Sequence, residues 1–146
     1  MLLPDVNVLI NTHRRNGPEF HAYQQWFADL LASDSAFGIS ELVLSGFVRI
    51  VTNPQVFSRP TPLRLALAFA AELRTHPRSV IIRPGDLHWD IFSDLCRKTD
   101  AAANRIPDAY FAAMAIESGC IWVTADKHFN QFPGLRCQHP LTGRKP

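Results

Sequence analysis

The 146-residue sequence lacks the features that mark membrane, secreted or disordered proteins. No apolar run approaches the roughly 18 residues that a membrane-spanning helix needs. Pro4, Asp5 and Asn7 interrupt the apolar N-terminal segment, and no basic segment precedes it, so we expect no signal peptide. Charged residues make up 19% and hydrophobic residues 47% of the chain, which excludes a disordered polypeptide. We therefore expect a cytoplasmic protein that has a packed core and does not bind membranes.

The chain also has few cysteines and a low net charge. Cys96, Cys120 and Cys137 are odd in number and have no metal-binding spacing, which favours buried, reduced thiols. The net charge of +2 is compatible with an anionic partner but does not by itself indicate nucleic acid. The sequence contains no internal repeat or low-complexity segment. Its length fits a single domain over residues 1–146.

Short apolar segments alternate along the chain with segments of helical periodicity. The predicted strands are residues 1–5, 36–39, 79–82, 120–123 and 135–137. The predicted helices are residues 19–32, 41–52, 61–75, 87–98 and 107–118, with a short helical turn at 7–11 and polar loops at 11–18 and 99–106. Ser40 and Asp86 are expected to cap helices. The alternation predicts an α/β fold, a three-layer α/β/α sandwich around a mainly parallel sheet of four or five short strands.

Two acids flank the most informative part of the sequence. Pro107 suits the first helical position, so Asp108 falls in the first turn, where free N–H groups favour a negative charge. Residues 120–123 indicate a buried strand, and Asp126 lies just beyond its C-terminal end. In open parallel sheets, these ends of strands and helices lie along one edge, where ligands bind. Both carboxylates are therefore expected at that edge.

Two further acids occupy similar positions. Asp5 ends the first strand, and Glu41 begins a helix after the second. Taken singly, each of the four acids could be a turn residue or could complement a helix dipole. Together they favour a binding site, because carboxylates crowded into one cleft relieve their repulsion by binding protons or a cation. Oxygen ligands in an incomplete cage select Mg²⁺ or Mn²⁺.

The motifs that contain these acids resemble those of PIN-domain nucleases and, more narrowly, of VapC toxins from bacterial toxin–antitoxin pairs, particularly the mycobacterial group. The motifs are Asp5-Val6-Asn7, Ser40-Glu41 with residues 47–54, Ile106-Pro107-Asp108-Ala109, and residues 123–129. The resemblance covers nearly the whole chain. It implies an endoribonuclease toxin that hydrolyses phosphodiester bonds of structured RNA, such as tRNA or rRNA, and that forms a homodimer and binds a VapB-like antitoxin.

The resemblance also implies roles for individual residues. Asp5, Glu41, Asp108 and Asp126 would bind Mg²⁺ or Mn²⁺ directly or through water, and Asn7 and Thr124 would be supporting polar residues. We predict Asp5, Asp108 and Asp126 as the metal ligands and Glu41 as the group that orients or deprotonates water. Many relatives carry a further acid where this chain has His128, so the resemblance leaves open whether one or two metal ions bind.

Several alternatives remain open at this point. The same acids would serve a DNA-directed nuclease or a phosphatase, and a non-catalytic RNA-binding or protein-binding module is a further possibility. Five cations near the predicted site could either neutralise RNA phosphates or be scattered surface charges: Arg14, Arg15, Arg49, Arg105 and Lys127. The three tryptophans, Trp26, Trp89 and Trp122, are predicted to lie in the core rather than to stack on bases.

Apolar residues on two predicted helices exceed what one small face needs to bury. They are Phe20, Tyr23, Phe27 and Leu31, together with the leucines of residues 61–75. This excess predicts an exposed apolar patch that binds a partner, although a fully buried core would also explain it.

Overall fold

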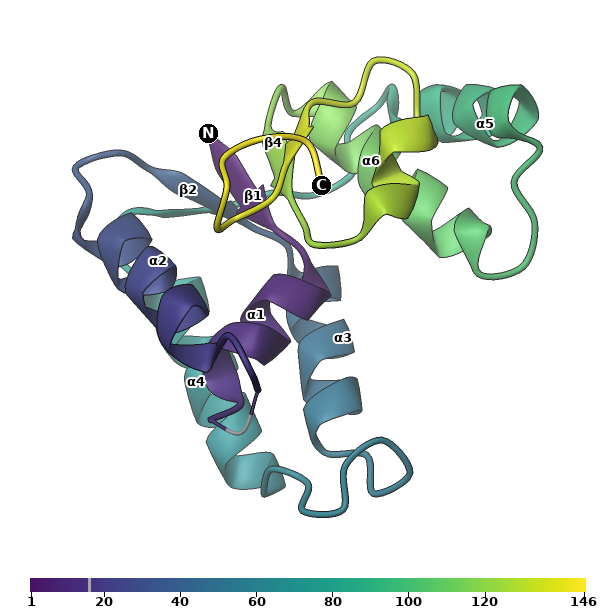
Figure 1. Ribbon diagram of the computed structural model, residues 1–146. Coiled ribbons are helices and arrows are strands. Elements are labelled where there is room, and N and C mark those ends of the chain that lie inside the picture. Colours follow the sequence, from purple (N-terminus) through teal and green to yellow (C-terminus); the bar gives the residue numbers. More distant parts are fainter. Residues whose placement is uncertain (16) are drawn as a thin grey trace.

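Five short strands form a central sheet in the order β3-β2-β1-β4-β5, and every pairing is parallel (Figure 1). The strands are β1 (Leu2–Pro4), β2 (Phe37–Ile39), β3 (Ser79–Ile81), β4 (Ile121–Val123) and β5 (Cys137–Gln138). The protein is seen in a computed structural model that describes residues 1–15 and 17–146; Asn16, which falls in the predicted loop at 11–18, lies outside the described residues. The sheet confirms the predicted parallel α/β fold.

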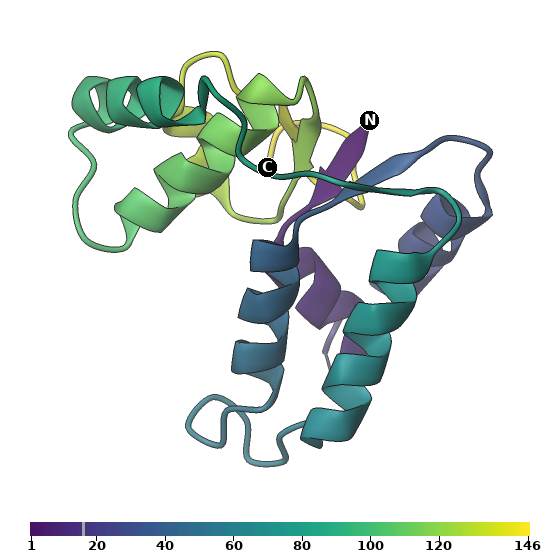
Figure 2. The ribbon, with the colours of Figure 1, turned by 180° about the vertical axis from the view of Figure 1, so that it is seen from behind.

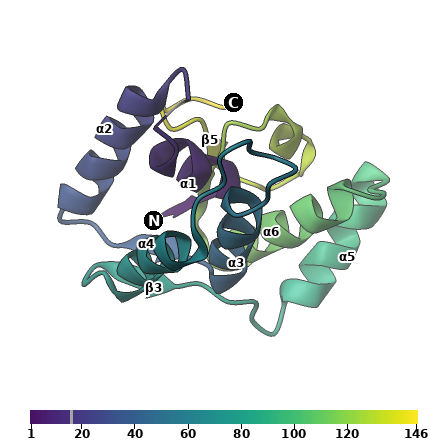
Figure 3. The ribbon, with the colours of Figure 1, turned by 90° about the horizontal axis from the view of Figure 1, so that it is seen from below.

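Helices cover both faces of this sheet (Figures 1 and 2). One group comprises α1 (Val6–His13), α2 (Phe20–Ala32), α3 (Glu41–Val51) and α4 (Leu63–Thr75). The other comprises α5 (His88–Thr99), α6 (Arg105–Glu117) and the 3₁₀ helix η1 (Lys127–Gln131). The chain winds outward from β1 to β3 and then crosses back to β4, so right-handed connections place the two groups on opposite faces. The view from below separates α5 and α6 from the other group (Figure 3).

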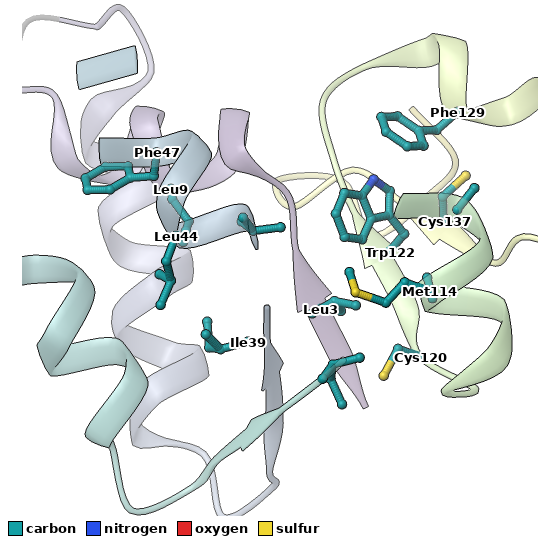
Figure 4. Packing of buried hydrophobic residues seen from close by; sticks show 14 of the residues in the cluster. Leu3, Leu9, Ile39, Leu44, Phe47, Met114, Cys120, Trp122, Phe129 and Cys137 are labelled. Carbon is teal, nitrogen blue, oxygen red and sulfur yellow. The ribbon is translucent and has the colours of Figure 1, made fainter. Parts of the chain in front are cut away.

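The core lies on both sides of the sheet (Figure 4). Leu9 and Phe47 fill the side of the first helical group, and Trp122 fills the side of α6, all three being 0% exposed. Trp122 therefore lies in the core as predicted. The same prediction was wrong for Trp89, which is 67% exposed on α5, and Trp26 is only partly buried.

Several helix ends lie where capping residues in the sequence predict them. Ser40 caps α3, where its Oγ accepts a hydrogen bond from the N–H of Leu42 at 3.3 Å. Gly119, with φ of +65°, follows the end of α6, because this left-handed conformation favours glycine. The helical turn predicted at 7–11 is a longer helix, Val6–His13, and Asp5 caps its start.

Two predicted helix starts differ from the structure. Helix α6 begins two residues before Pro107, which is tolerated because N–H groups of the first turn have no partner within the helix. Asp86 does not cap α5; Leu87 is its N-cap residue. The N–H groups of Gly85 and Leu87 instead donate to the carboxylate of Glu117, at 2.7 and 2.9 Å.

The predicted apolar patch divides into a buried and an exposed half. Phe20, Tyr23 and Phe27 of α2 are buried, whereas Leu63 and Leu67 of α4 are 58% and 51% exposed. The three cysteines are free thiols, and two of them are buried. None of the helices in the described ranges has the length and hydrophobicity needed to cross a bilayer.

Candidate metal centre

Three of the predicted acids line one cavity of about 540 Å³, which we call the acid cavity. Asp5 and Asp126 follow the paired strands β1 and β4, in which Pro4 is in register with Val123. Asp108 lies in the first turn of α6. The C-terminal ends of two strands and the N-terminal end of a helix therefore bring together acids that are up to 121 residues apart, counted as 126 minus 5. This is the edge at which the sequence placed them.

Three groups of the chain hold the carboxylate of Asp5. Its Oδ1 accepts the N–H of Val6 at 2.6 Å, and its Oδ2 accepts the side-chain N–H of Asn7 and the hydroxyl of Thr124, both at 2.7 Å. The amide oxygen of Asn7 in turn accepts the N–H of Ala125 at 3.2 Å. The same hydroxyl oxygen of Thr124 accepts the N–H of Asp126 at 3.0 Å. Asn7 and Thr124 thus connect the two strand ends, as a supporting pair would.

The surroundings of the cavity raise the pKa of two of its carboxyl groups. The pKa of Asp5 is raised from 3.8 to about 6, mainly by burial and to a smaller extent by the charges of Asp108 and Asp126, while the hydrogen bonds from Thr124 and Val6 act to lower it. Burial, followed by the charge of Asp126, also raises the pKa of Asp108. The carboxylates therefore repel one another across a partly desolvated space, and a bound cation would relieve this repulsion.

Oxygen atoms of all three carboxylates remain available to an ion. Asp108 accepts no hydrogen bond from the described residues, and Asp126 uses only its Oδ1, which accepts the N–H of His128 at 2.8 Å. Asp5 retains a lone pair on Oδ1. Within residues 1–15 and 17–146, no three such side chains already converge closely enough to enclose a metal. The donor set thus fits a hard divalent cation, and the carboxylates would have to turn toward one another to hold it.

Glu41 is not in this cavity. Its Oε1 accepts the Nε–H of Arg74 at 2.7 Å, and its Oε2 accepts an N–H of Arg83 at 3.0 Å. These hydrogen bonds hold the pKa of Glu41 below its usual range. Glu41 lines a neighbouring groove between α3 and α4. The sequence indicated its position at the start of α3, but nothing in the sequence indicated the two arginines.

Arg49 is the basic residue among those that line the acid cavity. It lines both the acid cavity and the neighbouring groove, and its side chain forms no ion pair with any described residue. His128, on η1, is 80% exposed at the side chain, and its Nδ1 lies 3.1 Å from Oδ1 of Asp126. Arg49 was among the cations that the sequence analysis singled out, and the structure places it beside the acids.

Aromatic residues form much of the remaining wall. Phe92 of α5, Tyr110 and Phe111 of α6, and Phe129 of η1 line the cavity. Phe92 and Tyr110 were not predicted as site residues. Tyr110 has a local signal, since it follows Asp108 within one helical turn. Phe92 has none, because only the packing of α5 against α6 brings it there.

Comparison with known proteins agrees with this arrangement. The family model for the PIN domain matches residues 2–135. Ribonuclease VapC43 of Mycobacterium tuberculosis is 40% identical over 144 residues, which cover 99% of this chain and 98% of the relative. The chain belongs to the VapC ribonucleases of the PIN-domain family. Ribonuclease VapC25 of the same organism is 36% identical over 140 residues, covering 96% of this chain and 99% of that one.

Solved structures of VapC proteins share the fold at lower sequence identity. VapBC2 from Rickettsia felis, bound to a DNA fragment from its promoter, matches with a TM-score of 0.69 and 17% identity over 94% of this chain and 97% of that one. VapC20 of Mycobacterium tuberculosis, described as a toxin that cleaves the sarcin–ricin loop, matches with a TM-score of 0.64 and 17% identity over 93% and 99%. The resemblance inferred from the acidic motifs is therefore confirmed for this VapC chain.

Proposed function

We propose that this VapC protein is the endoribonuclease toxin of a toxin–antitoxin pair, and that it hydrolyses phosphodiester bonds of structured RNA with Mg²⁺ or Mn²⁺ held in the acid cavity. The observation that carries this proposal is the meeting of Asp5, Asp108 and Asp126 in one cavity of a VapC chain. Relatives that are ribonucleases by name share up to 40% of its sequence. Its place of action would be the cytoplasm, where structured RNA is available.

The proposed roles of the residues follow from their contacts. Asp5, Asp108 and Asp126 would bind the cation, and Asn7 and Thr124 would keep Asp5 oriented through their hydrogen bonds. A divalent cation supplies a water molecule of lowered pKa and polarises a phosphoryl oxygen. Arg49 would neutralise a phosphate of the RNA beside the acids. Glu41 would orient or deprotonate the water, for which its side chain must leave Arg74 and Arg83 and turn toward the cavity.

A cleavage assay with matched variants tests this function. Purified protein is incubated with total tRNA and rRNA in the presence of Mg²⁺, Mn²⁺ or a chelator, with single-stranded DNA and a phosphate monoester as comparison substrates. We expect the protein to cleave RNA but neither DNA nor the phosphate monoester, and to do so only when metal is present. Asp126→Asn should abolish it, whereas Asp90→Asn, on an exposed part of α5, should cleave like the original chain. Undiminished cutting by Asp126→Asn would refute the site, and preferred cutting of DNA would refute the substrate class.

A VapB-like antitoxin would be the partner, as in the structural neighbours described as VapBC complexes. The groove between α3 and α4, which includes Leu67 and has a volume of about 600 Å³, offers an apolar surface for it. A homodimer would use further apolar surface in the same way. Size-exclusion chromatography with light scattering, before and after addition of the product of an adjacent small reading frame, measures both assemblies.

A further inference from the structure

A third pocket, at the opposite end of α1 from Asp5, is lined mainly by arginines. It lies between the end of α1 and the connection between α3 and α4, and has a volume of about 320 Å³. We call it the arginine pocket, and its lining consists of His13, Arg14, Arg15, Arg59 and Thr61. No acidic residue is among them. None of the three arginines forms an ion pair within the described part of the chain.

Arg14 is held in place by contacts that leave its charge uncompensated. One terminal N–H donates to the carbonyl oxygen of Arg59 at 2.9 Å, and the guanidinium carbon lies 4.0 Å from the ring centre of Phe57. Its Nε is buried and has no hydrogen-bond partner among the described residues. A guanidinium fixed in this way loses little further freedom on binding an anion. The pocket is therefore preorganised for an anionic group.

The neighbouring side chains add hydrogen-bonding groups to the pocket. His13 Nε2 and the hydroxyl of Thr61 lie 3.3 Å apart. Burial and the charge of Arg14 lower the pKa of His13, so at neutral pH the imidazole is neutral. The positive charge of the pocket thus comes from the arginines, which stay protonated throughout the physiological range. Binding of an anion here should change little between pH 7 and pH 9.

Helix α1 connects the two sites. Asp5 is its N-cap residue and Arg14 its C-cap residue. The nine residue steps from Asp5 to Arg14 span about 14 Å at about 1.5 Å per residue. That length corresponds to the axial rise of roughly four nucleotides in a stacked strand, at about 3.4 Å per nucleotide. A strand whose phosphate is cut at the acids therefore has other phosphates at the right distance to reach the arginines.

We propose that the arginine pocket is a phosphate-binding subsite, which holds the RNA backbone a few nucleotides away from the bond that is cut. This inference rests on the proposed ribonuclease function. The ligand chemistry is a nucleic acid phosphodiester, bound through the guanidinium groups of Arg14, Arg15 and Arg59. The contact carries no base information, so it contributes affinity and orientation rather than sequence preference.

Binding measurements with uncut RNA test the subsite separately from catalysis. The protein carries Asp126→Asn and is kept in chelator, and the probe is a fluorescein-labelled RNA hairpin followed by anisotropy. On this background Arg15→Ala and Arg59→Ala are combined; both side chains are exposed, and the carbonyl oxygen that holds Arg14 remains. We expect about tenfold weaker binding, and a slope of log affinity against log salt that is smaller by about one to two.

The control removes the same charge from elsewhere. Arg97→Ala and Arg144→Ala, also exposed and in no ion pair among the described residues, should change the affinity less than about twofold. Equal weakening by both pairs would overturn the subsite, because it would show only a general charge effect. Unchanged binding by the Arg15 and Arg59 pair would overturn it as well. Loss of antitoxin binding without loss of RNA binding would assign the pocket to a protein partner instead.

Cleavage kinetics provide a second and independent readout. With the acids intact and metal present, Arg15→Ala combined with Arg59→Ala should raise KM about tenfold and leave kcat within about twofold, since the contact is uniform between ground and transition states. A fall in kcat at unchanged KM would contradict a backbone subsite. If the original chain cuts no RNA, the nuclease proposal fails, while the anisotropy result still decides whether the pocket binds RNA.

Discussion

Asp5 in the acid cavity and Glu41 in the neighbouring groove are both acids at helix starts that follow strands, yet their surroundings are opposite. Asp5 is 6% exposed and is held by neutral donors, and its pKa is raised to about 6. Glu41 has 42% of its side chain exposed and lies between two arginines that lower its pKa. Asp5 lacks a counter-charge and Glu41 already has two. A bound cation would therefore stabilise the carboxylates of the acid cavity much more than it would stabilise Glu41 in the groove.

The largest difference between these two regions is expected in catalysis. Asp5→Asn should lower the cleavage rate by more than about 100-fold, which exceeds the 10–100-fold loss typical of residues that only support a metal ligand. Glu41→Gln should lower the cleavage rate by about 10–100-fold, because it removes a group that does not bind the metal directly. Single-turnover cleavage of one RNA by both variants measures this. Equal losses would mean that Glu41 binds the ion as directly as Asp5.

The pH dependence of stability offers the next largest contrast. Because its pKa rises from 3.8 to about 6 on folding, Asp5 binds its proton more tightly in the folded metal-free protein than in the unfolded chain. The contribution of Asp5 to the free energy of unfolding is therefore full below pH 4 and is lost as pH rises through 6, by about 3 kcal/mol. Denaturant titrations in chelator at pH 4, 5, 6 and 7.5 follow this trend.

The shift of Asp5 has a metal-dependent control. Millimolar Mn²⁺ should restore stability at pH 7.5 and have little effect at pH 4.5, where the carboxyl group is protonated. A metal-free protein whose stability increases steadily from pH 4 to 7.5 would show that Asp5 does not dominate the linkage.

The smallest contrast concerns the groups that hold each acid. Thr124→Val removes a buried hydroxyl that donates to Asp5 and accepts from Asp126, so it should cost about 1–3 kcal/mol of folding stability. Arg74→Ala breaks an ion pair whose two side chains are 50% and 42% exposed, and should cost less than about 1 kcal/mol. Thr12→Val, which removes only a bond to the carbonyl oxygen of Val8 within α1, is the matched control for Thr124→Val. Urea unfolding of the three variants ranks them.

Sequence reasoning succeeded where a local signal coincided with the topology of the fold. Asp126 could be placed because a buried strand ends three residues before it, and Asp108 because it lies in the first turn of a helix after a loop. The rule that parallel strands share one functional edge then united them with Asp5. These three placements depend only on where strands end and helices begin, which hydrophobic periodicity indicates.

The remaining features of the site depend on side-chain contacts between distant segments. Arg74 and Arg83 lie 33 and 42 residues from Glu41, and no periodicity pairs them with it. Trp89 resembles a core residue in a sequence, since tryptophan is large and apolar, but its position on α5 faces solvent. At the start of α5, the N–H groups of Gly85 and Leu87 donate to Glu117 and not to Asp86, because tertiary packing brings the Glu117 carboxylate to them. Such choices are made by packing and are invisible in local patterns.

The pairing of β1 with β4 has a consequence for the synthesis of the protein. β1 is synthesised before β4, and more than 110 residues separate Pro4 from its partner in register, Val123. Contacts so distant in sequence form late, because the loop between them must close first. The acid cavity therefore cannot form on a nascent chain that has not reached Asp126, so a ribosome that stalls before this residue releases a fragment without the proposed metal site.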